Sequence, residues 1–171
     1  MEWQWEEGSV LNKTSSYVAT SDIFLAVCRE VGRYFENSDG FKVSKRKVKW
    51  TGQMLRCEMA FWSSHYNMCG KYVCFDIVPS VYAKDKSGMV KNGLLPILSD
   101  HCARTFDVCR IDTDLFFKII EAIEKQLEYV RYLDSKENYL KFVETRIPPK
   151  YRYNGEENTE ILAERLKKRK E

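Results

Sequence analysis

One stretch of the chain, residues 41–81, constrains the fold more than any other, because apolar and polar side chains alternate along it. Successive side chains of a β-strand point to opposite faces of a sheet, so an alternating run predicts one buried and one exposed face. The apolar members of the alternation are Val48 and Trp50, then Leu55, Cys57, Met59 and Phe61, then Val73, Phe75 and Ile77. We therefore predict three antiparallel strands, each with one face in the core.

Turn-forming residues between these strands predict their register. Thr51-Gly52 suits a two-residue hairpin loop, which would place Val48 opposite Leu55. The next connection is longer, and if it is centred near Asn67 it pairs the following two strands: Phe61 with Val73, Met59 with Phe75, and Cys57 with Ile77. In this register all apolar side chains share one face, and a slip by one residue would reverse every one of them.

The polar face of this predicted sheet is the candidate binding surface. Its expected members are Lys45, Lys47, Lys49, Arg56, Glu58, Trp62, Tyr72 and Asp76. Glu58 would lie directly across from Asp76, with Lys45 opposite Glu58 to balance the two like charges. Two carboxylates so placed suit acid–base chemistry or a bound cation. An exposed charge ladder is the simpler interpretation, because catalytic carboxylates normally lie in a pocket.

Helices are predicted to supply the rest of the core. A first helix begins near Thr20, Ser21 and Asp22, which are N-cap residue types, and ends before residues 37–40. The strongest pattern covers residues 113–132, capped by Asp112, with one apolar stripe. Ser135 is expected to cap a short helix that ends before residues 147–149, and residues 157–170 form a weaker helical pattern with a basic end.

These elements predict an α+β fold with an N-terminal helix, an antiparallel β-meander, and C-terminal helices packed on one face of the sheet. With 171 residues, of which 44% are hydrophobic, the chain is long enough to bury roughly 70% of its unfolded surface as a single domain. Residues 1–19 are interpreted as an N-terminal extension of this domain, and residues 150–171 as a basic C-terminal helix or tail.

The cysteines and histidines predict neither disulfides nor a metal centre. Several of the six cysteines occupy apolar positions, and the first residues have no secretory apolar region, so we expect reduced thiols and a cytoplasmic protein. His65, Cys69 and Cys74 are close in sequence, as are His101, Cys102 and Cys109, but no CxxC or HxxxH pair occurs. Structural zinc sites usually contain such a tight pair, so no metal or other cofactor is expected. No apolar run reaches the roughly 18 residues that cross a bilayer, so no membrane partner is expected either.

No catalytic signature appears in the chain. The two histidines, His65 and His101, match neither a nucleophile elbow nor a cysteine-protease signature. The phosphate-binding patterns GxxxxGK[ST] and GxGxxG are absent, and the segment KDKSGMVKNG predicts a turn-rich loop. An uncharacterised enzyme therefore stays an alternative for which no catalytic residue is named.

Basic residues gather in two places although the net charge is only +3. One cluster lies at residues 45–49 and the other at residues 165–170, and Trp50, Trp62 and Tyr72 are near the first. Aromatic rings beside a basic strand are typical of single-stranded nucleic-acid sites. Trp50, however, is predicted to face the core, nearby carboxylates weaken the positive field, and lysines on an edge strand also prevent edge-to-edge pairing. Nucleic-acid binding through the basic strand and the basic tail is thus a second alternative.

The pattern of residues 21–83 resembles a family of small bacterial domains of unknown function. The resemblance rests on a capped first helix ending in an Asp-Gly-Phe turn, a basic strand, a Phe-Trp-Ser-Ser step, and the strand KYVCFDIVPSV. Some members of that family accompany polymorphic toxins as presumed immunity proteins. The resemblance implies a non-enzymatic domain that binds another protein, with a toxin as the specific partner. We expect the polar sheet face, or the loop of residues 84–101, to form the contact.

Overall fold

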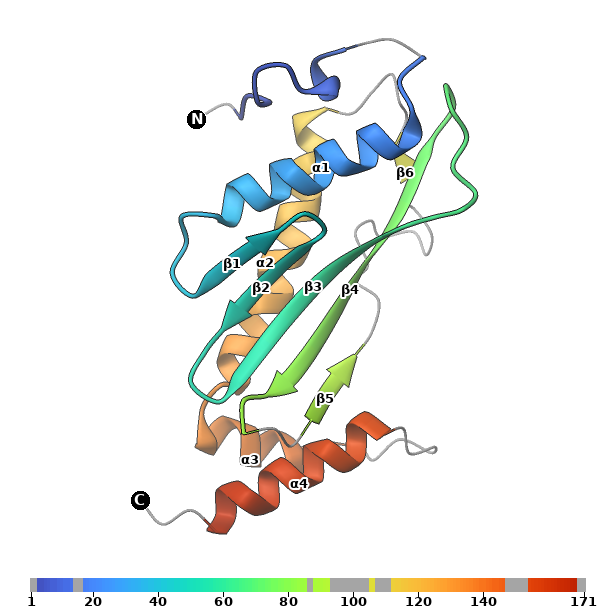
Figure 1. Ribbon diagram of the computed structural model, residues 1–171. Coiled ribbons are helices and arrows are strands. Elements are labelled where there is room, and N and C mark those ends of the chain that lie inside the picture. The colour runs from blue at the N-terminus through green and yellow to red at the C-terminus, as the bar shows by residue number, and fades with distance from the viewer. Residues whose placement is uncertain are drawn as a thin grey trace.

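The computed structural model describes residues 3–13, 17–85, 88–92, 105–106, 112–146 and 154–168, and it confirms the α+β class (Figure 1). In chain order the elements are η1 (Val10–Asn12), α1 (Thr20–Phe35), β1 (Phe41–Ser44), β2 (Lys47–Thr51), β3 (Leu55–Ser63), β4 (Val73–Ala83), β5 (Gly88–Asn92), β6 (Thr105–Phe106), α2 (Thr113–Leu133), α3 (Lys136–Thr145) and α4 (Asn154–Lys168).

The strands form an antiparallel sheet in the order β1-β2-β3-β4-β5, and β6 pairs with the start of β4. Two local predictions were wrong. The predicted first strand is a hairpin, since Ser44 pairs with Lys47 and leaves Lys45-Arg46 as its two-residue turn. The segment predicted as a turn-rich loop contains strand β5, which pairs with the second half of β4.

Both predicted registers were wrong by four residues. Val48 pairs with Met59 instead of Leu55, because Thr51 pairs with Arg56 and the β2–β3 loop is longer than two residues. Phe61 pairs with Ile77 instead of Val73, because β3 and β4 continue further toward the loop that joins them. A shift by an even number of residues leaves each side chain on its original face. The predicted apolar face is therefore confirmed, and its residues are buried.

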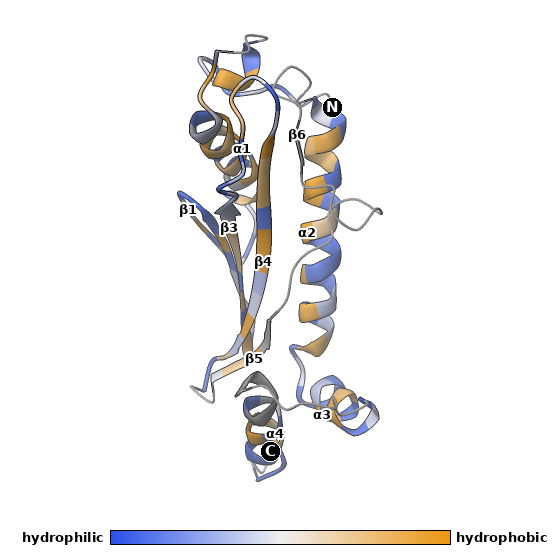
Figure 2. Ribbon diagram, turned by 90° about the vertical axis from the view of Figure 1, so that its right-hand side faces the viewer, coloured by the Kyte–Doolittle hydropathy of each residue, from blue (hydrophilic) through white to orange (hydrophobic). Residues whose placement is uncertain are grey.

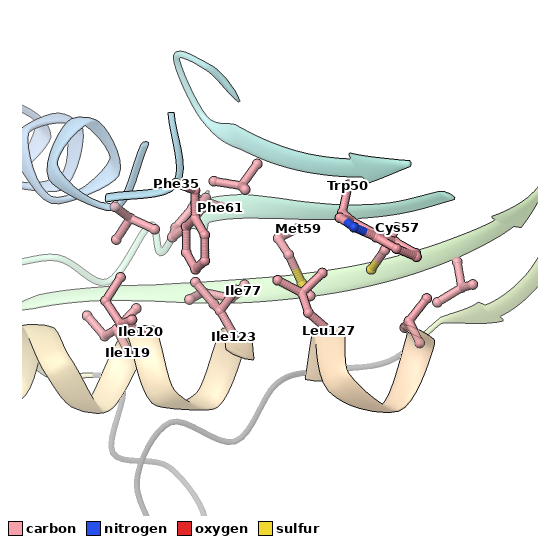
Figure 3. Close-up of a cluster of buried hydrophobic side chains, with 14 of the residues drawn as sticks. Phe35, Trp50, Cys57, Met59, Phe61, Ile77, Ile119, Ile120, Ile123 and Leu127 are labelled. Carbon is pink, nitrogen blue, oxygen red and sulfur yellow. The ribbon is translucent and has the colours of Figure 1, made fainter. Parts of the chain in front are cut away.

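Helix α2 covers this apolar face. Figure 2 shows α2 along the length of the sheet, with hydrophobic residues on the side that faces β4. Helix α1 crosses one end of the same face, where the rings of Phe24 and Phe75 lie 5.6 Å apart. Figure 3 shows the side chains of α2 and of the sheet pointing toward each other: Ile119, Ile120, Ile123 and Leu127 from α2, and Met59, Phe61 and Ile77 from β3 and β4.

The predicted helix caps are confirmed at two helices out of three. The carboxylate of Asp112 accepts a hydrogen bond from the backbone N–H of Leu115, and the Ser135 hydroxyl accepts one from Asn138. Helix α1 differs from the prediction, because its N-cap is Ala19 and no side chain caps it.

The β2–β3 loop is held by one carboxylate from the end of α2. The two oxygens of Asp134 accept hydrogen bonds from three consecutive backbone N–H groups: Gln53 at 2.5 Å, Met54 at 2.8 Å and Leu55 at 2.7 Å. Gly52 makes this approach possible, because a Cβ atom there would overlap the Asp134 carboxylate and the Trp50 ring. This contact fixes both the length of the loop and the register of β2 against β3.

Residues 3–13 pack across α1 and α2 through a buried carboxylate. Glu30 of α1 is 1% exposed and accepts hydrogen bonds from the Trp3 indole at 3.2 Å and the Glu6 backbone N–H at 2.9 Å. Arg33 forms a 2.8 Å salt bridge with Glu30 and also donates to the backbone carbonyl of Gln4. A buried carboxylate needs such partners, so this segment supplies polar contacts that α1 alone lacks.

The last described helix, α4, packs against β5 at the other end of the sheet from α1 (Figure 1). Its Asn158 and Thr159 side chains donate to the backbone carbonyls of Met89 and Val90 at 3.0 and 2.8 Å. Its buried apolar residues are Leu162, Ala163 and Leu166. Among the helices that the structure describes, none is both long enough and apolar enough to span a bilayer.

The environments of the described cysteines predict their reactivity. Burial raises the pKa of the Cys28 thiol to about 12, and the nearby Arg46 charge opposes that rise only in part. Cys57 is fully buried, whereas Cys69 is exposed. Because the thiolate is the reactive form, iodoacetamide at pH 8 is expected to modify Cys69 and to spare Cys28 and Cys57. Peptide mapping by mass spectrometry checks this, with the urea-unfolded protein as the control in which all three react. Modification of Cys28 as fast as Cys69 in the native protein would contradict it.

Candidate binding surface

The charged residues of the predicted polar face form a cluster different from the one predicted. Glu58 pairs across the strands with Lys49 on one side and Ser80 on the other. Its carboxylate forms 3.4 Å salt bridges with Lys47 and with Lys49. The predicted ladder of Lys45, Glu58 and Asp76 is therefore wrong, because the register shift moves Asp76 away from Glu58 and the hairpin places Lys45 in a turn.

The other predicted site residues are spread over the length of the sheet. Arg56 pairs with Tyr82, and its guanidinium lies 4.8 Å from the centre of that ring. Trp62 pairs with Asp76 six residues further along β3, which is roughly 20 Å away at the usual rise of a strand. Tyr72 lies outside the strands, in the loop that joins β3 to β4. The structure thus brings Lys47, Lys49 and Glu58 together and leaves Arg56 far from Trp62.

The polar face is also less open than its sequence indicates. Val78 lies on this face, directly opposite Ala60, and is only 6% exposed. Asp76 and Ser80 beside it are half-buried. The centre of the face is therefore a poor docking surface, and its accessible parts are the two ends of β3, at Arg56 and at Trp62, and the β1–β2 hairpin.

Large apolar side chains are exposed together at one end of the molecule. Trp62 at the end of β3 is 61% exposed, and Tyr66 and Met68 in the following loop are 71% and 43% exposed. Tyr17, which precedes α1, is 92% exposed. The ring of the exposed His65 lies 3.9 Å from that of Tyr66. We define the hairpin-tip surface as these five residues: Tyr17, Trp62, His65, Tyr66 and Met68. A cluster of exposed apolar residues marks an interaction site more often than an isolated exposed residue does.

Local hydrogen bonds give the β3–β4 loop a defined shape. The Ser64 hydroxyl accepts from the Tyr66 backbone N–H at 3.1 Å, and the side-chain amide oxygen of Asn67 (Oδ1) accepts from the Cys74 backbone N–H at 2.5 Å. The Met68 N–H donates to the carbonyl of Tyr72 at 3.2 Å, closing a tight turn in which Gly70 has a positive φ of 73°. A loop shaped before it meets a partner loses less conformational entropy on binding.

The start of α1 reaches the same loop. The Cys69 thiol donates to the backbone carbonyl of Val18 at 3.5 Å, which brings the segment containing Tyr17 to the hairpin tip. Figure 1 likewise shows the β3–β4 loop and the beginning of α1 at one end of the sheet.

Cationic side chains border the hairpin-tip surface. The Phe61 backbone N–H donates to the Arg46 carbonyl at 3.0 Å, so the Lys45-Arg46 turn lies beside the end of β3, next to Trp62. The Arg46 guanidinium lies 5.4 Å from the Phe24 ring, which holds it at the surface of α1. We define the basic hairpin as the five cationic residues of β1, β2 and their turn: Lys42, Lys45, Arg46, Lys47 and Lys49.

The two basic clusters of the sequence do not form one path. Figure 1 shows the β1–β2 turn near α1 and the basic end of α4 beyond the opposite end of the sheet. In α4, Arg165 forms a 3.4 Å salt bridge with Asp85. A nucleic-acid site that uses both clusters would therefore have to extend over the length of the molecule.

Metal coordination finds no support among the described residues, where no three His, Cys, Asp or Glu side chains are close enough to hold an ion. His101, Cys102 and Cys109, which were close in sequence but were not expected to bind a metal, lie outside the described residues, as does most of the predicted contact loop from residue 86 onward.

The sequence carries signals for the hairpin tip, but these signals on their own indicate only a connection between two strands. Ser63, Ser64, Asn67 and Gly70 indicate a structured turn, and Tyr66 and Met68 lie within it. Comparison with known proteins adds no functional assignment: no family model, no curated protein and no solved structure matches this chain.

Proposed function

We propose that this chain is a non-enzymatic domain that binds another protein through the hairpin-tip surface. The observation that carries the proposal is the exposure of Trp62 at the end of β3 together with Tyr66 and Met68 on the loop of defined shape that follows, near Tyr17. Trp and Tyr are the residue types that most often dominate the energy of protein interfaces, because they bury a large area at a small entropic cost.

Inhibition of a toxin is the specific form of this function that we propose, on the strength of the family resemblance. A cytoplasmic location belongs to the same proposal, since Cys28 and Cys57 are buried among core residues, as expected for small apolar side chains of a protein that keeps its thiols reduced. An immunity protein acts by covering a surface of its partner, so a preformed aromatic loop suits it without any catalytic group.

The double substitution Trp62→Ala with Tyr66→Ala is expected to weaken binding of the native partner by at least about 30-fold, the equivalent of one hot-spot residue of 2 kcal/mol. The fold should persist, because neither side chain is in the core. The partner is identified by affinity purification from the native host with quantitative mass spectrometry, and its affinity is then measured by calorimetry with each variant.

Tyr132→Ala is the matched control, because Tyr132 is 51% exposed on α2, away from the hairpin tip. It should leave the affinity within about twofold of that of the unmodified chain. A specific protein partner whose affinity is the same for the double variant and for the control would refute the proposed surface. Recovery of nucleic acid alone would refute the proposed class of function.

A further inference from the structure

The hairpin-tip surface and the basic hairpin together point to the chemistry of the partner. We propose that the partner presents an acidic protein segment, with carboxylates around an apolar side chain. This inference rests on the proposed function and narrows it from any protein to one of stated charge.

Positive charge gathers beside Trp62. Lys42 and Lys49 pair across β1 and β2, so both are on the polar face, and Lys47 follows on the same face. The Lys45-Arg46 turn continues this positive region to the end of β3. Glu58 is the carboxylate that contacts the cluster, through its salt bridges with Lys47 and Lys49.

These cations are accessible to a partner. The side chains of Lys47 and Lys49 are 47% and 43% exposed although both contact Glu58. Lys42, Lys45 and Arg46 are exposed as well. Among the residues that the structure describes, Glu58 is the carboxylate that forms salt bridges with two of these five cations, so the surface stays positive. Interfaces that form quickly and specifically pair a positive surface with a negative one.

The extent of the positive region favours an acidic protein over a nucleic acid. This region is confined to one short hairpin, whereas a single strand needs a groove that follows its backbone. An acidic peptide with one apolar anchor fits better, because the anchor can bind Trp62 and Tyr66 while its carboxylates reach the basic hairpin.

The test uses the full chain and a phage-displayed library of random 12-residue peptides as the probe. Enriched peptides are expected to contain several Asp or Glu residues around an aromatic or aliphatic residue. The tightest synthetic peptide is expected to bind the variant Lys42→Glu with Lys45→Glu about tenfold more weakly or worse, because both substitutions reverse a charge at the contact. Its affinity for the unmodified chain should also fall as salt is raised from 50 to 300 mM.

Lys118→Glu with Lys141→Glu is the matched control, since both lysines are exposed on α2 and α3 and the net charge changes equally. This variant should bind the peptide within about twofold of the unmodified chain. The inference would be overturned if the two variants bound the peptide equally weakly. Enrichment of peptides without acidic residues, or no enrichment at all, would also overturn it. Non-acidic peptides whose binding falls with Trp62→Ala would overturn it and leave the proposed function standing. A labelled dT20 strand that binds more tightly than the best peptide, and loses binding with the basic-hairpin variant, would assign the surface to nucleic acid instead.

Discussion

Replacing Phe75 with alanine is expected to lower the free energy of unfolding by about 3–5 kcal/mol, the usual range for a large aromatic residue removed from a core. Phe75 is 1% exposed at the place where α1 meets the sheet, and its ring lies 5.6 Å from Phe24 and 6.2 Å from Phe61. The substitution would therefore leave a cavity between α1 and the sheet. Urea denaturation followed by circular dichroism measures the change, with the slope of the transition confirming that the folded state is the same.

Phe117→Ala is the control for this substitution. It removes the same type of side chain from α2, but Phe117 is 39% exposed. Its expected cost is under about 1 kcal/mol. If both variants lost equal stability, the assignment of Phe75 to the junction of α1 and the sheet would be wrong.

Replacing Asp134 with alanine is expected to cost about 2–4 kcal/mol, because three backbone N–H groups lose a charged acceptor at once. Two of those groups, on Met54 and Leu55, are at the point where β3 begins, and Leu55 is fully buried. The loss should appear both in urea denaturation and as faster hydrogen exchange of the amides of residues 53–55.

Asp39→Ala provides the comparison, since Asp39 is exposed in the turn between α1 and β1. It is expected to change stability by about 0.5 kcal/mol or less. Unchanged exchange at residues 53–55 in the Asp134 variant would show that the carboxylate does not hold the loop in solution.

The sequence predicted the faces of the sheet correctly and its residue pairs incorrectly, for one physical reason. Alternation depends only on whether a position is odd or even, and it placed Met59, Phe61 and Phe75 in the core. Pairing depends on loop length, and the β2–β3 loop is set by Asp134, about eighty residues away in the chain. A contact that distant leaves no mark in the local pattern of residues 41–81.

The candidate site was predictable in part for the same reason. Parity alone placed Trp62 on the outer face, where it is 61% exposed. The partners of Trp62 could not be predicted, because Tyr66 and Met68 are in a loop without periodicity and Tyr17 reaches it through the Cys69 contact with Val18. The docking of residues 3–13 on Glu30 was likewise invisible, since one glutamate in a helix usually faces water.

The contacts of Trp3 and Trp5 have a consequence for the order in which parts of the chain fold during synthesis. The rings of Trp3 and Trp5 lie 5.1 and 5.3 Å from that of Phe116, which belongs to α2. At translation rates of about 5–20 residues per second, a ribosome reaches Phe116 roughly 5–20 s after Trp5. Over that interval the two indoles have no α2 to pack against. The segment that contains Trp3 and Trp5 therefore joins the folded structure only after the long helix α2 has emerged.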